Sequence, residues 1–411
     1  MPDFQRILYR CEKSSYISDR LVDRFLIPLC AAEEGLEKKF AQQLSEYRHI
    51  VNKMPSGWPG WLISQDIAFQ LFRENGLARN YLEHSQVRRR SDREQDYLKF
   101  QIDHPWRFVF CSVIQRLRDS FLEMTDVLTG EKFLLYSPGI EAQEKQGSIS
   151  MYFLLVGFNG SCWQTYGTIA YLKGIQPFDL DYYAKQVKPD LVSKDQIPEL
   201  IDQNPLPFMM LWSGGEFPVA FHKDDMVVVA RSEFQLDNFT PQDYAKHFVM
   251  QEKNSVYRLS LKRWHEFPHY CRCYYSVETK QLTVNAMTKR GYLKLISVLN
   301  EYGMKFSDNP QILVTMAMLM TAKEILQRDM EADPYEKLFA VKPAPGADRE
   351  MERLNQFVGL LMEHINAGRE YDIRKLAAQA GIDYENARRI AEQIGEKMVK
   401  ARNASIVPSD K

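Results

Sequence analysis

The sequence has few cysteines, no long apolar run and almost no net charge, and each of these shortages excludes a class of protein. Six cysteines in 411 residues, of which only Cys271 and Cys273 lie close together, are too few for a disulfide framework. The apolar runs are much shorter than the roughly 20 residues that a membrane-spanning helix needs. With 53 basic and 54 acidic side chains the formal net charge is −1, so no overall field attracts the chain to nucleic acid or to an anionic membrane. Any such binding must be local.

The opening residues, Met1 to Arg6, lack the basic segment followed by an apolar segment that marks a secretory signal. We therefore expect a soluble, cytoplasmic protein whose cysteines are reduced and mostly buried. A hydrophobic content of 45% and a charged content of 26% are those of folded globular proteins. Because 411 residues exceed one ordinary hydrophobic core, about two to four domains are expected.

Residues 1–104 are predicted to be mostly helical, because apolar residues recur at helical spacing, as they do from Leu21 to Leu29. The stretch Pro55–Trp61 interrupts this pattern, since its prolines and glycines do not continue a helix. Its two tryptophans, Trp58 and Trp61, are interpreted as packing one element onto another rather than as binding a ligand.

Residues 105–175 are predicted to form an antiparallel, barrel-like β unit. β-branched and aromatic residues dominate from Trp106 onwards, and about five strands fit in the segment. Thr129-Gly130 and Asn159-Gly160 are typical of hairpin turns. A run of strands must hide its edges, so we expect a small barrel or a strongly curled sheet.

Residues 176–337 are predicted to form a second α+β unit, residues 338–348 a linker and residues 349–403 a small trihelical tail. Ile175–Pro207 is predicted to be a helical connector, and Pro343–Ala347 breaks all periodicity, as a linker does. The expected fold class is therefore α+β and multidomain, with a helical N-terminal region and a β-rich middle. The expected strands of the second unit are Met209–Trp212, Val219–Phe221, Met226–Ala230, Val256–Leu261, Tyr270–Ser276 and Gln281–Ala286, and its expected helices are Gly291–Tyr302 and Ile312–Leu326.

The stretch Arg263–Cys273 contains a His-Glu-x-x-His pattern, with its histidines at positions 265 and 269. A zinc protease needs both histidines on one face of a helix, with the glutamate activating water. Pro268 disfavours a helix here by about 3 kcal/mol, and the flanking segments have the composition of strands. We predict that His265–Pro268 connects two strands and holds no catalytic zinc.

A second metal-site interpretation uses His269, Cys271 and Cys273, which would share one face of a strand. The same three residues could equally lie in a core against apolar partners. No second Cys or His cluster lies at ligand spacing in the sequence to complete four ligands. We therefore expect no metal and no cofactor.

Three further polar patterns are interpreted as structural. Ser213–Glu216 matches neither a nucleophile elbow nor a phosphate loop, and is predicted to be a glycine hairpin. Asp179 and Asp181 follow Pro177 and are predicted to begin a helix. The basic run Arg88–Arg90 is followed by interleaved acids and is predicted to be a solvated face. No residue is nominated as catalytic.

The most specific pattern lies in Ile373–Ala391. Leu376–Ala380 supplies a small apolar face, Gly381 stands where a helix would end in a left-handed residue, and Asp383 is suited to cap the next helix. Ala387 would then face back onto the first helix. This stretch resembles the helix-turn-helix superfamily and is especially similar to the motif that opens LacI-type repressors, and the resemblance covers about 25 of the 411 residues.

The resemblance implies that Tyr384, Glu385, Arg388 and Arg389 lie exposed on the helix that enters the major groove. Arginine is the commonest specific reader of guanine. Carboxylates such as Glu385 and Glu392 repel phosphate, and the same helical geometry also serves as a protein-interaction module.

We therefore expect a cytosolic, non-enzymatic protein that regulates through nucleic-acid binding by its tail, while its β-rich body senses or binds a partner. The alternative is an interaction or scaffold protein whose tail docks another chain, and an enzyme hidden in the body is the third reading. The expected partner of the tail is double-stranded DNA or, in the alternative, a protein. No membrane partner is expected.

Overall fold

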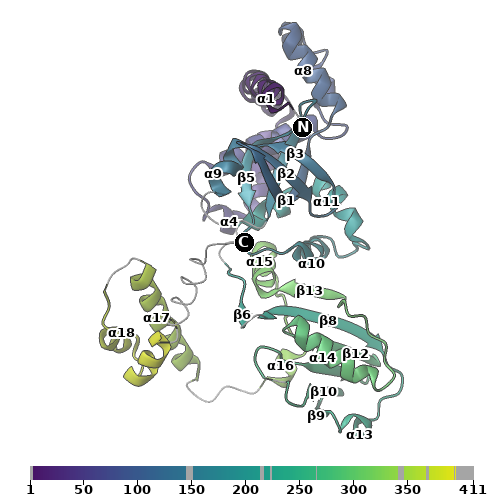
Figure 1. Ribbon diagram of the computed structural model, residues 1–411, viewed down its shortest axis with the longest axis vertical. Coiled ribbons are helices and arrows are strands. Elements are labelled where there is room, and N and C mark those ends of the chain that lie inside the picture. The colour runs from purple at the N-terminus through teal and green to yellow at the C-terminus, as the bar shows by residue number, and fades with distance from the viewer. Residues whose placement is uncertain are drawn as a thin grey trace. The chain divides into compact units, whose positions relative to one another are not determined.

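The computed structural model describes residues 3–144, 151–212, 217–222, 225–264, 266–340, 347–366, 370–392 and 394. The chain divides into two compact units, residues 1–335 and residues 336–411. The fold is mixed α+β, with a helical N-terminal region, a closed five-stranded barrel, further sheets and helices near the C-terminus (Figure 1). The predicted fold class is confirmed.

The N-terminal region is helical, as predicted. One correction concerns the stretch with two tryptophans: α5 begins at Trp58, so Trp58–Trp61 is the first turn of a helix. Pro59 is tolerated there because the first helical N–H groups have no partner within the helix. The elements are α1 (Phe4–Ser18), the π-helical segment η1 (Asp19–Leu26), α2 (Ile27–Glu34), α3 (Leu36–Glu46), α4 (Arg48–Val51), α5 (Trp58–Phe72), α6 (Ala78–Tyr81), α7 (Ser85–Arg88) and α8 (Asp92–Asp103).

The barrel follows in the order β1-β2-β3-β5-β4. The hairpins predicted at Gly130 and Gly160 are confirmed, and both glycines have a positive φ. Neighbouring strands run antiparallel except β3 and β5. A closed ring with an odd number of strands cannot alternate throughout, so one neighbouring pair must be parallel. The strands are β1 (Arg107–Arg118), β2 (Phe121–Asp126), β3 (Lys132–Tyr136), β4 (Tyr152–Phe158) and β5 (Trp163–Tyr171), and α9 (Pro138–Glu144) follows β3.

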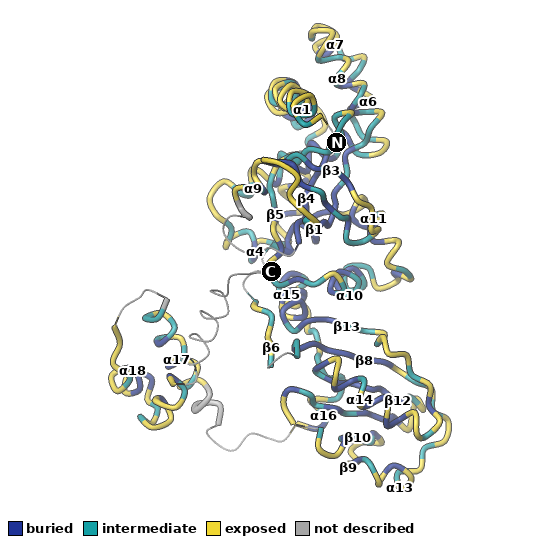
Figure 2. Tube along the Cα trace, viewed as in Figure 1, coloured by how far each residue is buried: buried dark blue, intermediate teal, exposed yellow. Residues whose placement is uncertain are grey.

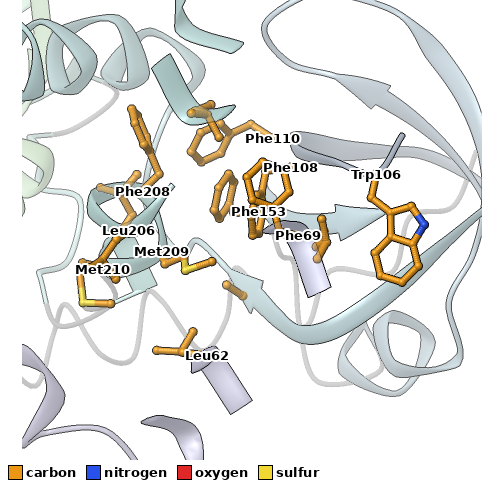
Figure 3. Packing of buried hydrophobic residues seen from close by; sticks show 14 of the residues in the cluster. Leu62, Phe69, Trp106, Phe108, Phe110, Phe153, Leu206, Phe208, Met209 and Met210 are labelled. Carbon is orange, nitrogen blue, oxygen red and sulfur yellow. The ribbon is translucent and has the colours of Figure 1, made fainter. Parts of the chain in front are cut away.

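Strand β4 and the first part of β1, Phe108–Cys111, are buried on both faces. Their side chains alternate between a core inside the barrel and a larger core outside it, which helices cover. Val109, Cys111, Tyr152, Leu154 and Val156 belong to the inner core, whereas Phe108, Phe110, Phe153 and Leu155 belong to the outer core (Figure 3).

The connector after the barrel is helical, as predicted, and Phe208 of α12 lies against the outer core of the barrel (Figure 3). α10 begins at Pro177, which confirms the predicted helix start beside Asp179. The segment Met209–Trp212 is not a strand: Met209 ends α12 and residues 210–212 form a short 3-10 turn. A short, fully buried apolar run carries no periodicity that separates helix from strand. The connector elements are α10 (Pro177–Val187), the 3-10 turn η2 (Lys194–Gln196), α11 (Ile197–Gln203) and α12 (Leu206–Met209).

A six-stranded antiparallel sheet follows, in the order β13-β8-β12-β11-β10-β9, and residues of α14 pack on it (Figure 1). Two predictions need correction. The predicted strand Val219–Phe221 is a strand only at Phe221, which begins the two-residue β6, and Ile312–Thr315 is a strand that leads directly into a helix. Strand β9 was not predicted. The elements are β6 (Phe221–His222), β7 (Asp225–Met226), β8 (Val228–Gln235), α13 (Pro241–Tyr244), β9 (Phe248–Lys253), β10 (Val256–Leu261), β11 (Arg272–Ser276), β12 (Gln281–Ala286), α14 (Lys289–Asn300), β13 (Ile312–Thr315) and α15 (Met316–Leu326).

The C-terminal unit contains α16 (Glu336–Phe339), α17 (Ala347–Asn366), α18 (Ile373–Ala380) and a further helix over residues 384–392. Within the predicted linker 338–348, residues 341–346 lie outside the described residues. The linker and the predicted boundaries around it stay predictions.

Phe110 joins the barrel to the connector. It is fully buried, its ring centroid lies 4.4 Å from that of Phe153, and its ring meets Phe208 edge-on (Figure 3). Phe110→Ala is expected to lower the free energy of unfolding by about 3–5 kcal/mol, because it leaves a cavity in a packed core. The matched control is Ile114→Ala on the same strand, where the side chain is 41% exposed, and its effect should stay within about 0.5 kcal/mol. Denaturant unfolding followed by circular dichroism measures both, and equal losses would contradict this packing.

Asp179 ties α10 to the start of α15. Its fully buried carboxylate accepts hydrogen bonds from the N–H and hydroxyl of Thr315, at 2.7 and 3.0 Å, and from the N–H of Gln176 at 2.8 Å. Burial outweighs these bonds and raises the pKa of Asp179 to about 6. The folded state therefore holds the proton of Asp179 more tightly than the unfolded state does. The contribution of Asp179 to the free energy of unfolding consequently falls as pH rises.

We expect the unfolding free energy of the wild type, minus that of Asp179→Asn, to fall by about 2–3 kcal/mol between pH 4 and pH 7. This fall in stability should begin above the pKa of Asp179 in the unfolded chain and end just above its pKa in the folded protein. Asp181→Asn is the control, because the Asp181 carboxylate pairs with Lys185 on the surface of the same helix. A difference that rises with pH would show that the buried carboxylate is the preferred form.

Candidate functional sites

The predicted site residues of the tail lie on the second of two helices joined by residues 381–383. Gly381 ends α18 in the left-handed conformation, with φ at 68°, and the N–H of Ile382 donates to the carbonyl of Ala377. The Asp383 carboxylate accepts from the N–H of Asn386 at 3.1 Å and so caps the next helix. These two local predictions are confirmed, while the helix-turn-helix resemblance itself stays a prediction.

A small core holds these helices together. Ala387 is fully buried, as predicted, and packs with the side chains of α17 and α18, while the outward faces of the helices are exposed (Figure 2). Alanines at the contact let two short helices approach closely. The buried members of this core are Phe357, Leu361, Leu376, Ala377, Ala380, Ala387 and Ala391.

The four predicted residues do not form one cluster. Arg388 is paired on its own helix with Glu385 at 3.1 Å and with Glu392 at 3.5 Å. Arg389 donates to the side-chain oxygen of Asn386 at 3.3 Å and has no carboxylate partner among the described residues. It is therefore the more available of the two arginines.

Tyr384 makes a separate contact, with the first of the two helices. The guanidinium of Arg374, on α18, lies 4.9 Å from the centroid of its ring. Arg374 was not predicted as a site residue, because nothing in the linear pattern relates it to Tyr384. The contact adds a cation from the first helix to the same surface.

A second site lies in the N-terminal unit and was not predicted. It is a cavity of about 670 Å³ between the N-terminal helices and strand β5. Three tryptophans and two tyrosines contribute to its walls, with serine, threonine and glutamine side chains between them. The tryptophans and tyrosines are Trp58, Trp61, Tyr97, Trp106 and Tyr166, and Phe158 is a sixth aromatic residue of the lining.

One wall of the cavity is shaped by an irregularity in β5. The pairing with β4 shifts between Phe153 and Leu155, and Gly167 has a φ of +71° at this point. The Gln65 amide donates to the carbonyl of Tyr166 at 3.2 Å, and a Cβ on Gly167 would come within 2.9 Å of the Gln65 side chain. Glycine is therefore required here both by backbone conformation and by space.

A second part of the lining is held by amide contacts of Gln101. The indole N–H of Trp106 donates to the side-chain oxygen of Gln101 at 2.6 Å, and the Gln101 amide donates to the carbonyl of Phe158 at 3.0 Å. Gln101 therefore fixes the ring of Trp106 rather than offering free donors to a ligand.

Of the described residues that line the cavity, Asp23 alone carries a carboxylate, and none is a lysine, arginine or histidine. It comes from the π-helical segment η1, a type of distortion that is frequent at functional sites. Its carboxylate accepts a hydrogen bond from the Tyr166 hydroxyl and forms no ion pair among the described residues. Asp23 is exposed as a whole residue, but desolvation of its carboxylate against the cavity wall raises its pKa.

The two tryptophans at the start of α5 fit both interpretations of the sequence, packing between elements and binding of a ligand. The Trp58 ring packs on Trp212, with centroids 4.6 Å apart, as the packing interpretation expects. Trp61 is 56% exposed and, like Trp58, lines the cavity. The signal that could have revealed the site was this pair of neighbouring tryptophans, but the other residues of the cavity, on α8 and β5, are distant in sequence.

The His-Glu-x-x-His stretch is not a helix where it is described. Glu266 to Pro268 connects β10 to β11, as predicted, and His265 lies outside the described residues. Cys271 and Cys273 are buried in the core of the six-stranded sheet, where burial raises the pKa of the Cys271 thiol to about 12. No group of three or more His, Cys, Asp or Glu side chains is placed to hold a metal within the described ranges.

Ser213–Glu216, the predicted glycine hairpin, also lies outside the described residues. Among the helices that the structure describes, none is long and apolar enough to cross a membrane. Comparisons with protein-family models, curated proteins and solved structures found no match for the chain.

Two glycines of the tail give variants with opposite expected effects. Gly381→Ala places a side chain at a left-handed position and should destabilise the C-terminal unit by about 1 kcal/mol. Gly359→Ala lies in open space on the exposed face of α17 and should stabilise the same unit by about 0.5–1 kcal/mol. Amide hydrogen exchange of residues 373–392 measures both. Unchanged exchange in Gly381→Ala would contradict the described turn, and faster exchange in Gly359→Ala would contradict the exposed place of Gly359 on α17.

Proposed function

We propose that the C-terminal unit binds double-stranded nucleic acid and that the chain is a non-enzymatic regulator. The observation that supports this most is the exposed pair Arg388 and Arg389, close to the start of a helix that a three-residue turn joins to α18. In proteins with this arrangement the early residues of the second helix contact base edges.

Arg389 is the stronger candidate for a base contact. Its guanidinium has only a long hydrogen bond to Asn386 to give up, and arginine can bond guanine with two donors. Arg374, stacked on Tyr384, presents a cation from the neighbouring helix that suits a backbone phosphate.

The ion pairs of Arg388 do not prevent such binding. Exposed pairs contribute roughly 0–1 kcal/mol each, so a phosphate could replace Glu385 or Glu392 as the partner. The same carboxylates nevertheless repel the nucleic acid backbone. Residues 370–392 carry four basic and five acidic side chains, which favours modest affinity over tight binding.

Protein docking is the second candidate function, and the balanced charge of this surface favours it. A face on which Glu385, Arg388 and Glu392 alternate could pair with an equally mixed face of a partner chain. Salt dependence separates the two functions, because phosphate contacts give a steep salt slope.

Fluorescence anisotropy of a labelled duplex with the full-length chain tests the proposal. Arg389→Ala should weaken binding by about 1–3 kcal/mol, and Arg388→Ala should weaken it less. Glu385→Gln/Glu392→Gln should strengthen binding, because it removes two repulsive charges and frees Arg388. The control is Arg24→Ala in the N-terminal unit, where the arginine pairs with Asp19 on the surface.

If the wild type binds no duplex at about 50 mM salt, where the attraction is strongest, nucleic-acid binding is ruled out. Stronger binding by the glutamine variant without any loss in Arg389→Ala would show that this surface binds the duplex without a contact from Arg389.

A further inference from the structure

We propose that the cavity beside β5 binds a small organic cation, an amine or quaternary ammonium group carried on an apolar body. This inference stands independently of the function proposed for the C-terminal unit, because it concerns different residues in the other unit. It rests on the charge, the aromatic walls and the remaining polar groups of the cavity.

Charge is the first argument. Asp23 is the one carboxylate among the described residues that line the cavity, and these include no lysine, arginine or histidine. A phosphate or carboxylate ligand would meet this carboxylate without any cation to balance it. A cationic ligand would instead give Asp23 the ion pair that it lacks among the described residues.

The aromatic walls are the second argument. The faces of tryptophan and tyrosine rings carry negative charge density and attract a cation placed over them. Trp58 and Trp61 are neighbours with ring centroids 6.4 Å apart, and Trp106 and Tyr166 form a second pair at 4.9 Å. Because Tyr166 also donates to Asp23, aromatic surface and negative charge lie next to each other. The size of the cavity falls within the range of about 300–1,000 Å³ that is usual for small-molecule sites.

The remaining polar groups are the third argument. Gln65 and Gln101 are already used to fix β5 and Trp106, as their hydrogen bonds to Tyr166 and Phe158 show. The Thr168 hydroxyl is itself buried, with no hydrogen-bond partner among the described residues. Asp23 therefore leaves one charged acceptor for a ligand, beside the neutral hydroxyls of the lining residues Ser14, Ser15, Ser18 and Ser64.

Three probes of the same shape and different charge separate this proposal from its alternatives. They are phenethylamine, 2-phenylethanol and phenylacetate, which are a cation, a neutral molecule and an anion at pH 7. Titration of the full-length chain, followed by saturation-transfer NMR of the probe, does not depend on the tryptophans of the protein. The amine should bind about tenfold more tightly than the alcohol, and phenylacetate should bind more weakly than both.

Two variants test whether Asp23 causes the preference for the amine over the alcohol. Asp23→Asn keeps an oxygen to accept from the Tyr166 hydroxyl and should reduce the affinity for the amine to that for the alcohol. Asp19→Asn is the matched control, one turn earlier on the same segment, where the carboxylate pairs with Arg24 outside the cavity. It should leave the affinity for the amine unchanged.

Trp61→Ala should weaken binding of the amine and of the alcohol together, because it removes an exposed aromatic wall, and circular dichroism checks that the variant remains folded. The proposal is overturned if the amine does not bind, if the alcohol binds as tightly as the amine, or if Asp23→Asn and Asp19→Asn have the same effect. Preferential binding of phenylacetate would also overturn it.

Discussion

The structure of the N-terminal unit depends on a barrel wall that is buried on both of its faces. In β4 and the first part of β1 every second side chain points into the barrel, while those between them point into the core that the helices cover. A slip of one residue in the pairing of Phe110 with Phe153 would exchange the two sets and expose aromatic rings. The register of the barrel and its helical cover are therefore fixed by the same alternation.

The helices cover the strands of the barrel unevenly, and the cavity results from this unevenness. β4 is almost continuously buried, whereas β5 is mostly half-buried. The irregular pairing at Gly167 turns the polar edge of β5 toward α5, and Gln65 holds it there. The space between α1, α5, α8 and β5 is consequently lined by aromatic rings and hydroxyls instead of being filled by aliphatic side chains.

Much of the fold was predictable from local sequence. The hairpin glycines, the start of α10 at Pro177, and the cap residues Gly381 and Asp383 each act within a few positions of the chain. The errors arose where local pattern carries no information. Met209–Trp212 is buried on all sides, and Ile312–Leu326 joins a strand to a helix without a break in its apolar run.

The cavity could not be predicted, because its residues come from segments that only the fold brings together. Tyr166 reaches Asp23 across more than a hundred residues, and Cys11 lies 3.4 Å from Cys162 in the same way. The tail is the opposite case, since its two helices lie within about 20 consecutive residues. Even there the sequence did not reveal that Glu385 and Glu392 pair with Arg388 and leave Arg389 more available.

The central claim is that the exposed face of the C-terminal helices is the surface that contacts nucleic acid. Hydrogen exchange of the full-length chain with and without an excess of duplex DNA, read by mass spectrometry at low salt, tests it most directly. We predict slower exchange confined to residues 373–392, which is lost when the salt concentration is raised. Unchanged exchange in these residues, or protection confined to the N-terminal unit, would contradict the claim.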